Sequence, residues 1–365
     1  MSKIIVNTKE ILKAVQTVGT CIKQKNTMPV LDNMLFWISD NQLTITADNL
    51  EIRTQVEVKV DYIGKIEIGV LYKLLTNILK GLLSAPMELS FNNFEINIKS
   101  GPGLYTIPLV KAEEFPMPKA LKESHSIKVN SLEFIEALRR AILFTEQENS
   151  RNLHNIFIGI SDGSTKIAST DGSVIYKYSL AATGQDQEND ILISRDIAKY
   201  FIQTITLDEE IEINYTQTHL LVQLENRLVT AILSQGKFPQ YDKLFASLSP
   251  NRFLKIDKAI IFPAIKRLYG IVDQNSHMLV FHLKDNKMEL SFNNPMFKYN
   301  AKETLKCEYK GEDIKIEFKA GYLMNMMTTL DEEIRMELSG PDKPCLFFAE
   351  NTRAILGPMS INGAW

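Results

Sequence analysis

A repeat of about 123 residues, present three times, constrains the fold of this chain more than any other feature of its sequence. Each copy opens with a short strand and an amphipathic helix, predicted at Thr8–Cys21, Ser131–Leu143 and Lys258–Val272. The residues just before these helices are Asn7, Asn130 and Asp257. Their side-chain oxygens can accept hydrogen bonds from the free amides of the first helical turn. Pro263 lies within the third helix and is expected to disturb its first turns.

Two further units recur at the same spacing. A strand, a tight polar turn and a second strand are predicted at Leu43–Val58, Thr165–Leu180 and Met288–Ala301. A second helix follows at Val70–Leu82, Ser194–Ile205 and Ala320–Leu330. Most other segments alternate apolar and polar residues, as half-buried antiparallel strands do. The pattern predicts an α+β chain of three repeated domains, residues 1–124, 125–251 and 252–365, each with antiparallel sheets on the outside and two helices on the inside.

Length and composition agree with this organisation. A chain of 365 residues exceeds what one hydrophobic core normally supports. The sequence shows neither a charged leader before an apolar run nor the roughly 18 consecutive apolar residues of a membrane span. Its three scattered cysteines, Cys21, Cys307 and Cys345, suit buried thiols in a reducing compartment. We therefore expect a cytoplasmic protein with no membrane partner.

The charge is divided unevenly between helices and strands. The predicted helical segments, taken as Thr8–Lys25, Val70–Gly81, Ser131–Leu143, Ser194–Ile205, Asp257–Tyr269 and Lys319–Leu330, carry a net charge of +9. Because the whole chain carries −3, the remainder carries −12. A basic helical side and an acidic sheet side would let the helices hold duplex phosphates without reading sequence. The alternative is that these lysines only mark solvated helix faces.

Four stretches, in order along the chain, point to a known family. They are Thr27–Asn33 followed by Leu43–Ile52, then Ala168–Gly172, then Phe238–Tyr241, and last Ile316–Leu330 followed by Ile334–Leu338. Each is short and unspecific alone, but their order and separations are specific together. Over essentially its whole length, the sequence resembles the bacterial DNA sliding clamp, the beta subunit of DNA polymerase III.

The resemblance implies a ring of six similar domains, formed when two chains close head to tail around duplex DNA. It pairs an edge of the first domain with an edge of the third, which here matches Tyr105 and Ile107 with Ile271. The alternative is that Tyr105 and Ile107 belong to the core of their own hairpin. For DNA, the resemblance points to Lys25, and helix position adds Lys13, Lys73, Lys80, Arg139, Arg140, Lys199, Lys266 and Arg267.

The resemblance also implies a groove for short peptides between the second and third domains. The matching residues are His154, Thr170, Gly172, Ile175, Pro239, Leu244, Tyr322, Pro344, Pro358 and Met359. Its partners would be the alpha subunit of DNA polymerase III, the clamp loader, other polymerases and repair proteins. Structural roles are the alternative: Gly172 can serve a turn, and Pro239 and Tyr322 can pack at a domain joint.

Two departures from the family bear on peptide preference. Ser173 and Val174 stand where the family usually has His-Arg, so a basic contact at the rim is missing. The chain also continues past Met359 to Trp365, where the family often ends. We hypothesise that Trp365 folds back near the groove, because a large aromatic residue next to an apolar cleft gains from burial.

Enzyme motifs are missing from the sequence. It contains no GxxxxGK[ST], GxGxxG, HExxH or CxxC, so no nucleotide, metal or cofactor site is predicted. Its five histidines show no ligand spacing. Besides a clamp, two readings stay open: a three-domain adaptor that never encloses DNA, and a DNA-processing enzyme whose site is assembled from distant residues.

Overall fold

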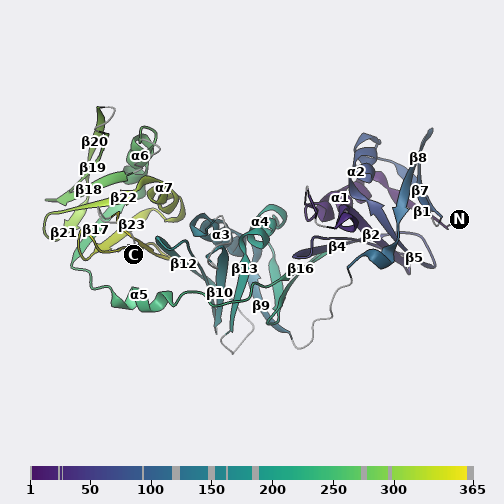
Figure 1. Ribbon diagram of the computed structural model, residues 1–365, viewed down its shortest axis with the longest axis horizontal. Helices are drawn as coiled ribbons and strands as arrows, with labels where there is room; N and C mark the ends of the chain where they lie inside the picture. The colour runs from purple at the N-terminus through teal and green to yellow at the C-terminus, as the bar shows by residue number, and fades with distance from the viewer. Residues whose placement is uncertain are drawn as a thin grey trace. The chain divides into compact units, whose positions relative to one another are not determined.

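The structure is a computed structural model that describes residues 2–23, 25–26, 28–92, 94–116, 124–146, 153–161, 163–182, 189–272, 278–294 and 298–359 (Figure 1). It divides into two compact units. Unit 1 comprises Met1–Leu132, Thr183–Gln185 and Lys199–Ser234, and unit 2 comprises Glu133–Ala182, Asp186–Ala198 and Gln235–Trp365. The units thus divide the second repeat between them, and the division into three domains stays a prediction.

The first repeat lies in unit 1. Its elements are β1 (Ser2–Asn7), α1 (Thr8–Gly19), the 3-10 helix η1 (Pro29–Asp32), β2 (Asn33–Ser39), β3 (Gln42–Asp48), β4 (Ile52–Lys59), β5 (Lys65–Leu71), α2 (Tyr72–Gly81), β6 (Pro86–Phe91), β7 (Glu95–Ser100), β8 (Gly103–Val110) and η2 (Ala112–Glu114). Asn7 Oδ1 accepts a hydrogen bond of 2.9 Å from the Lys9 amide, so the expected N-cap of α1 is confirmed. Gly19 allows α1 to approach α2, because a Cβ there would lie 2.2 Å from the Tyr72 ring.

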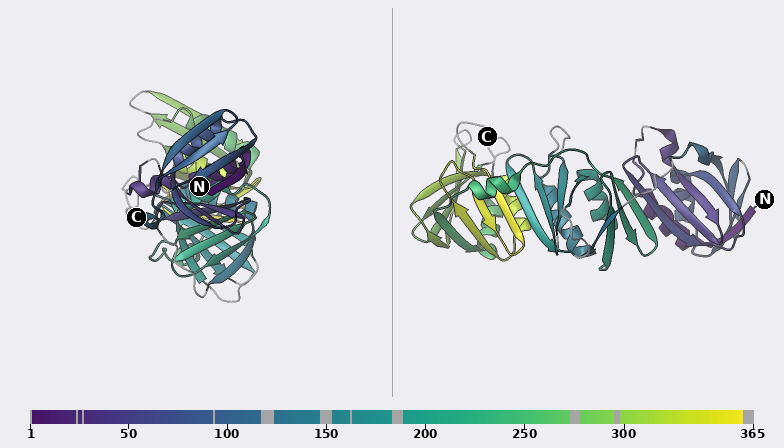
Figure 2. Two further views of the ribbon diagram at one scale, coloured as in Figure 1. Left: turned by 90° about the vertical axis from the view of Figure 1, so that its right-hand side faces the viewer. Right: turned by 90° about the horizontal axis from the view of Figure 1, so that it is seen from below.

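The second repeat has the same order of elements. It contains β9 (His125–Asn130), α3 (Ser131–Ala141), η3 (Ile142–Phe144), β10 (Asn155–Ser161), β11 (Ser164–Thr170), β12 (Val174–Ala181), β13 (Asn189–Ser194), α4 (Arg195–Thr204), β14 (Glu210–Tyr215), β15 (His219–Leu224) and β16 (Arg227–Ile232). A short helix that the sequence analysis did not predict, α5 (Tyr241–Ser247), follows β16. It lies on the face of the unit 2 sheet opposite α3 (Figures 1 and 2).

The third repeat lies in unit 2. Its elements are β17 (Arg252–Asp257), α6 (Lys258–Tyr269), β18 (Met278–Lys284), β19 (Lys287–Asn294), β20 (Tyr299–Lys306), β21 (Glu308–Lys310), β22 (Ile314–Lys319), α7 (Ala320–Thr329), β23 (Glu333–Leu338), β24 (Cys345–Phe348) and β25 (Thr352–Leu356). The predicted disturbance by Pro263 is wrong, because α6 runs unbroken from its cap, where Asp257 Oδ1 accepts from the Ala259 amide at 2.7 Å. Pro263 is exposed, so water can bond the carbonyl that the ring leaves without an amide donor.

Antiparallel strand pairing crosses from one repeat to the next. In unit 1, twelve strands form one sheet in the order β1-β6-β7-β8-β5-β2-β3-β4-β16-β15-β14-β9. In unit 2, nine strands run β13-β10-β11-β12-β25-β24-β23-β17-β21, and four more run β20-β19-β18-β22. Strand β4 therefore pairs with β16, and β12 with β25. We call these two pairings the repeat joints.

Helices cover one face of the strands in each unit, and their apolar sides are buried there. Helices α1 and α2 pack side by side in unit 1, as α6 and α7 do in unit 2 (Figure 1). With the observed bounds, α1, α2, α3, α4, α6 and α7 carry a net charge of +7 against −10 for the rest of the chain. No described helix is long and apolar enough to cross a bilayer. The antiparallel α+β architecture predicted from the repeat is confirmed.

Candidate functional site

The predicted groove residues gather in unit 2 around the second repeat joint. Strand β12 is tied to the first turn of α5, where Lys177 Nζ lies 3.1 Å from Asp242 Oδ1 and 5.4 Å from the Tyr241 ring centroid. Ile175 precedes Lys177 by two residues, so its side chain points to the same face of the sheet as Lys177. Leu244, on α5, is 38% exposed. An apolar side chain of the sheet and one of the helix thus lie on the same side of β12.

Two apolar residues beside Ile175 were missed by the sequence analysis. Ile355 pairs with Ile175, and Leu346 pairs with Ile355, so the three side chains form a row across β12, β25 and β24. Ile355 and Leu346 are both buried. Their neighbourhood depends on the pairing of strands about 180 residues apart, which no local pattern in the sequence reveals.

A tight turn between β11 and β12 carries two of the predicted groove residues, Thr170 and Gly172. Thr170 Oγ1 accepts from the Gly172 amide at 3.1 Å and donates to the Val174 carbonyl at 2.6 Å. Asp171 Oδ1 accepts from the amides of Ser173 and Val174, at 2.9 and 3.0 Å. Gly172 has φ of 92°, a conformation that side-chain-bearing residues rarely adopt. Gly172 therefore serves the turn, as the structural alternative predicted.

The C-terminal strand ends against this turn. The Gly357 amide donates to the Ser173 carbonyl at 3.0 Å, and the Met359 amide donates to the Glu317 carbonyl at 2.8 Å. Between them, Pro358 is buried, whereas Met359 is 42% exposed. Trp365 and the rest of the tail lie outside the described residues.

Tyr322, on α7, meets the same turn. Burial, followed by the hydrogen bond to the Asp171 carboxylate, raises the pKa of the Tyr322 phenol to about 12. The Lys319 ammonium lies 5.3 Å from the Tyr322 ring centroid. The packing role of Tyr322 at the joint is thus present, and its ring is half-buried.

The remaining predicted groove residues lie around this centre. His154 Nδ1 lies 3.2 Å from the Glu146 carbonyl, and the neighbouring Leu153 side chain is 3.8 Å from where a Cβ on Gly172 would stand. Pro344 is buried one residue before Cys345, which pairs with Leu356. Pro239 is exposed at the start of the segment that leads into α5.

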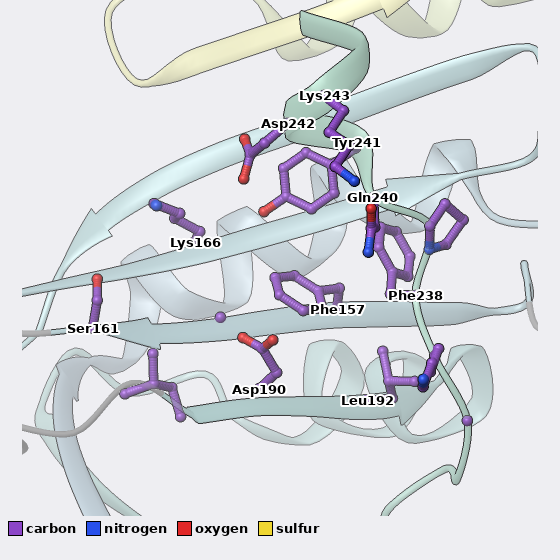
Figure 3. Close-up of a pocket in the computed structure, with 15 residues that line it drawn as sticks. Phe157, Ser161, Lys166, Asp190, Leu192, Phe238, Gln240, Tyr241, Asp242 and Lys243 are labelled. Atoms are coloured by element: carbon purple, nitrogen blue, oxygen red, sulfur yellow. The ribbon is translucent and has the colours of Figure 1, made fainter. Parts of the chain in front are cut away.

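A cavity of about 600 Å³ lies beside α5, on the side of β10, β11 and β13 (Figure 3). Its floor is Phe157, whose ring centroid is 5.2 Å from that of Phe238 and 5.7 Å from that of Tyr241. Gly159 makes room for the Phe157 ring, because a Cβ there would lie 2.7 Å from that ring. This aromatic cluster anchors α5 to the sheet, and only its tertiary arrangement distinguishes it from ordinary core residues.

The structure separates the predicted DNA-binding residues into two groups. Those with exposed side chains are Lys13, Lys25, Lys73, Lys80, Arg139, Lys199, Lys266 and Arg267. Arg139 Nη1 bonds Glu136 at 2.9 Å, and Arg267 bonds Glu303 through two nitrogens. Arg140 is the exception to exposure: it is 19% exposed.

Arg140, also predicted to contact DNA, bonds other residues of the protein instead of standing free on the helix surface. Its Nε donates to Glu136 at 3.0 Å and its Nη1 donates to the Thr329 carbonyl at 2.9 Å, while Asp331 lies 3.5 Å away. The guanidinium also lies 5.4 Å from the Tyr178 ring centroid. These contacts satisfy its charge inside the protein, and we exclude it from the DNA contacts.

The predicted edge residues differ in availability. Tyr105 is 38% exposed and Ile271 is 44% exposed, whereas Ile107 is 1% exposed. For the Ile107 side chain, the core alternative is therefore correct, because it packs opposite Ile96 inside its own hairpin. Leu104, at 67% exposure, was missed by the sequence analysis.

Comparisons of the sequence and of the structure with known proteins both match beta subunits of DNA polymerase III. The N-terminal domain model of the DNA polymerase III beta subunit matches residues 2–119, and the C-terminal domain model matches residues 249–355. The beta sliding clamp of Chlamydia muridarum is 21% identical over 366 residues, covering 99% of both chains. The crystal structure of DNA polymerase III subunit beta from Pseudomonas aeruginosa has 22% identity and a TM-score of 0.93, covering 98% of this chain and 100% of that chain.

A further solved structure is a sliding clamp from Pseudomonas aeruginosa bound to griselimycin. It is 22% identical to this chain, with a TM-score of 0.91, and the match covers 99% of this chain and 100% of that chain. The clamp of Bacillus subtilis superposes with a TM-score of 0.93 at 18% identity, with 99% and 100% covered.

The geometry of the turn predicts how Tyr322 titrates. Replacing Asp171 by Asn removes the carboxylate charge but keeps the oxygen that caps the turn, so the pKa of Tyr322 should fall from about 12 while staying above 10 because of burial. The ¹³Cζ NMR shift of Tyr322 against pH measures this. Asp242→Asn, which removes a carboxylate on α5, is the control and should leave Tyr322 unchanged. An unaltered Tyr322 pKa in Asp171→Asn would show that burial acts alone.

Proposed function

The chain belongs to the DNA polymerase III beta subunit family, the non-catalytic sliding clamps of DNA replication, and from this premise we propose that two copies close head to tail around duplex DNA. The observation that supports closure is the repeat joint. Three neighbouring strands lead to each joint: β2-β3-β4 at the first and β10-β11-β12 at the second. The third of these strands pairs with the last strand of the next repeat. Strand β20 is the corresponding third strand of the last repeat, and β8 is the last strand of the first.

Both of these strands have an open edge in the described chain. Strand β20 ends its four-stranded sheet, with β19 as its described partner. Strand β8 pairs with β7 along its length, but with β5 only through Leu109 and Val110. Open strand edges invite pairing with another chain. We infer that β20 of one copy pairs with β8 of the other, which repeats the joint twice more and closes a ring.

The internal joints also predict the register of this third joint. Thr54 pairs with Val229 at the first, and Tyr176 pairs with Ala354 at the second. By their places in the strand ladders, Ala301 corresponds to Thr54 and Tyr176, and Tyr105 corresponds to Val229 and Ala354. Tyr105 should therefore face Ala301 of the second copy, so that a large side chain again meets a small one.

Ile271 completes this inferred contact. Its equivalents after α1 and α3 are Cys21 and Phe144, which are buried, and Phe144 stacks on Tyr176 with ring centroids 5.1 Å apart. Ile271 is 44% exposed in a single chain, as expected if a second copy covers it. On closure it would cover Tyr105, burying two apolar side chains.

The proposed ring predicts the mass of a variant. Tyr105→Arg places a charge in the middle of the apolar contact, so the chain should sediment at 41.5 kDa rather than at the dimer mass of about 83 kDa. Sedimentation velocity measures this. Ile63→Arg is the matched control, because Ile63 is 89% exposed in the same unit but lies away from β8, and it should stay dimeric. A dimeric Tyr105→Arg would exclude this edge.

We propose that the exposed lysines of the helices hold the duplex inside the ring. Lys13 and Lys73 lie on α1 and α2, and Lys266 lies on α6, all on helices that cover one face of their sheet (Figure 1). Contacts of lysine with phosphates carry no sequence information and weaken with salt, which suits a protein that moves along DNA. Its place of action would be the cytoplasm, where the bacterial chromosome is copied.

Topological linkage is the property that separates a clamp from an adaptor. Protein loaded on a nicked circular plasmid should remain bound through gel filtration, and cutting that plasmid once should release it, because a ring slides off free ends. Blocking both ends of the cut plasmid with bound protein should restore retention. Equal retention on circular and cut DNA would favour the adaptor that never encloses DNA.

We propose that the groove beside α5 receives short peptides of polymerases, including the alpha subunit, and of the clamp loader and repair proteins. Ile175 is partly exposed and Leu244 on α5 is 38% exposed, so these two side chains offer apolar surface for a peptide, with the buried Ile355 and Leu346 beside Ile175 in the sheet. The griselimycin-bound relative supports a small-molecule or peptide site in this fold. Ser173 and Val174 supply no basic contact at the rim, so affinity should depend mainly on apolar contacts.

Griselimycin serves as a probe of this groove. Leu244→Glu places a carboxylate in the apolar surface, and we expect its affinity for griselimycin to fall at least about tenfold by isothermal calorimetry. Leu207→Glu, an exposed leucine of unit 1, should bind as the unaltered chain does. Equal affinity of the two variants would place the binding site elsewhere.

A further inference from the structure

We propose that Arg267 caps the C-terminal end of α2 in the second copy of this chain, and so acts as the residue that fixes the ring-closing joint. The inference rests on the proposed head-to-tail ring and goes beyond it by assigning one side chain a role across the closing contact. It also reassigns a residue that the sequence analysis placed against DNA.

The second joint shows the contact directly. Arg140, on α3, donates from Nη1 to the carbonyl of Thr329, the last residue of α7, at 2.9 Å. The last carbonyls of a helix lack amide partners and carry the negative end of its dipole, so a guanidinium there is stabilising. Arg140 Nε is held by Glu136 at 3.0 Å, which leaves Nη1 directed at the helix end.

At the first joint, an arginine also bonds the end of a helix, but it lies on a strand of the second repeat. Arg227, the first residue of β16, donates from Nη2 to the carbonyl of Thr204, the last residue of α4, at 2.7 Å. On the α1 side of this joint stands Thr17, beside a cavity of about 640 Å³ that Lys13 and Arg227 also line. The arginine thus comes from the second repeat itself, and α1 supplies none.

At each internal joint, one arginine bonds the end of a helix, and it comes from one of two positions that recur in every repeat. Thr17, Arg140 and Arg267 each stand ten residues after the N-cap position of their helix. Arg227 is the first residue of the last strand of its repeat. The strand registers give Thr352 as the equivalent position in the third repeat and Gly103 in the first. At the first joint, these two positions hold Thr17 and Arg227. At the second they hold Arg140 and Thr352, and at the closing joint they would hold Arg267 and Gly103.

The end of α2 is open to such a cap. Its last residue, Gly81, has no atom within 4 Å of where its Cβ would stand, outside its own helix backbone and chain neighbours. The strand position that supplies an arginine in the second repeat is Gly103 here, which has no side chain to reach the Gly81 carbonyl. The Tyr105 ring lies over Gly103, 2.9 Å from where a Cβ would stand, so the guanidinium from the second copy would reach the Gly81 carbonyl beside this ring.

Glu303, on β20, holds the Arg267 guanidinium through two hydrogen bonds. Arg267 Nε and Nη2 donate to the two Glu303 oxygens at 2.9 and 2.6 Å. Bidentate pairs of this kind restrict the guanidinium to one plane. As in Arg140, the Nε side bonds a carboxylate, so Nη1 is the nitrogen directed away from it. Arg267 is 61% exposed where Arg140 is 19% exposed, as expected if the second copy covers it.

Dimer dissociation tests the role of Arg267. In Arg267→Ala, the dimer dissociation constant from dilution of fluorescently labelled chains should rise at least about tenfold, because each ring loses a charge-assisted hydrogen bond at both closing joints. Lys266→Ala removes the neighbouring cation of the same helix and should leave the constant unchanged. Arg267→Lys keeps the charge but loses the fork, and should fall between them.

The outcomes separate this inference from the ring itself. If the unaltered chain is monomeric, the ring fails and the cap with it. If the unaltered chain and Arg267→Ala dissociate alike, only the cap is overturned, and weaker retention of Arg267→Ala on DNA would then show a phosphate contact. Far-UV circular dichroism of the Arg267→Ala monomer should match the unaltered chain, because an exposed side chain contributes little to the fold.

Discussion

Antiparallel strand pairing between successive repeats is the constraint on which the rest of this structure depends. Each repeat alone would leave two strand edges unpaired and part of its apolar face exposed. Pairing β4 with β16 and β12 with β25 satisfies the main-chain groups and buries Val229 and Tyr176. In the described chain, β20 and β8 keep open edges, and the proposed second copy would pair with both.

The proposed peptide groove lies at the second joint and uses residues of its paired strands. Ile175 and Ile355 are paired there, and α5 lies on the same face. At the first joint, the position equivalent to Ile175 is Arg53, which is 7% exposed and bonds Asp48 at 2.9 Å as well as the Pro116 carbonyl. A buried ion pair at the first joint thus stands at the position that an apolar side chain holds at the second joint.

The basic residues of the helices serve two purposes that net charge does not distinguish. Arg140 donates hydrogen bonds to Glu136 and to the end of α7, and Arg227 donates one to the end of α4. Both arginines therefore hold the joints. Lys13 and Lys73 carry exposed ammonium groups on the helical face. The arginine fork suits fixed carbonyl and carboxylate partners, whereas mobile lysines suit phosphates that slide past. This division of labour follows from the chemistry of the two side chains.

The sequence by itself determined the repeat, the order of strands and helices, the caps at Asn7 and Asp257, and the family, because these depend on local periodicity and short motifs. Only the tertiary structure decided that Ile107 faces its own core, that Arg140 is spent at a helix end, and that Ile355 and Leu346 stand beside Ile175. These outcomes depend on strand register and on charge partners far apart in the chain. A period of about 123 residues predicts equivalent positions, but which edges meet is settled by the main-chain hydrogen bonds and buried surface of the folded protein.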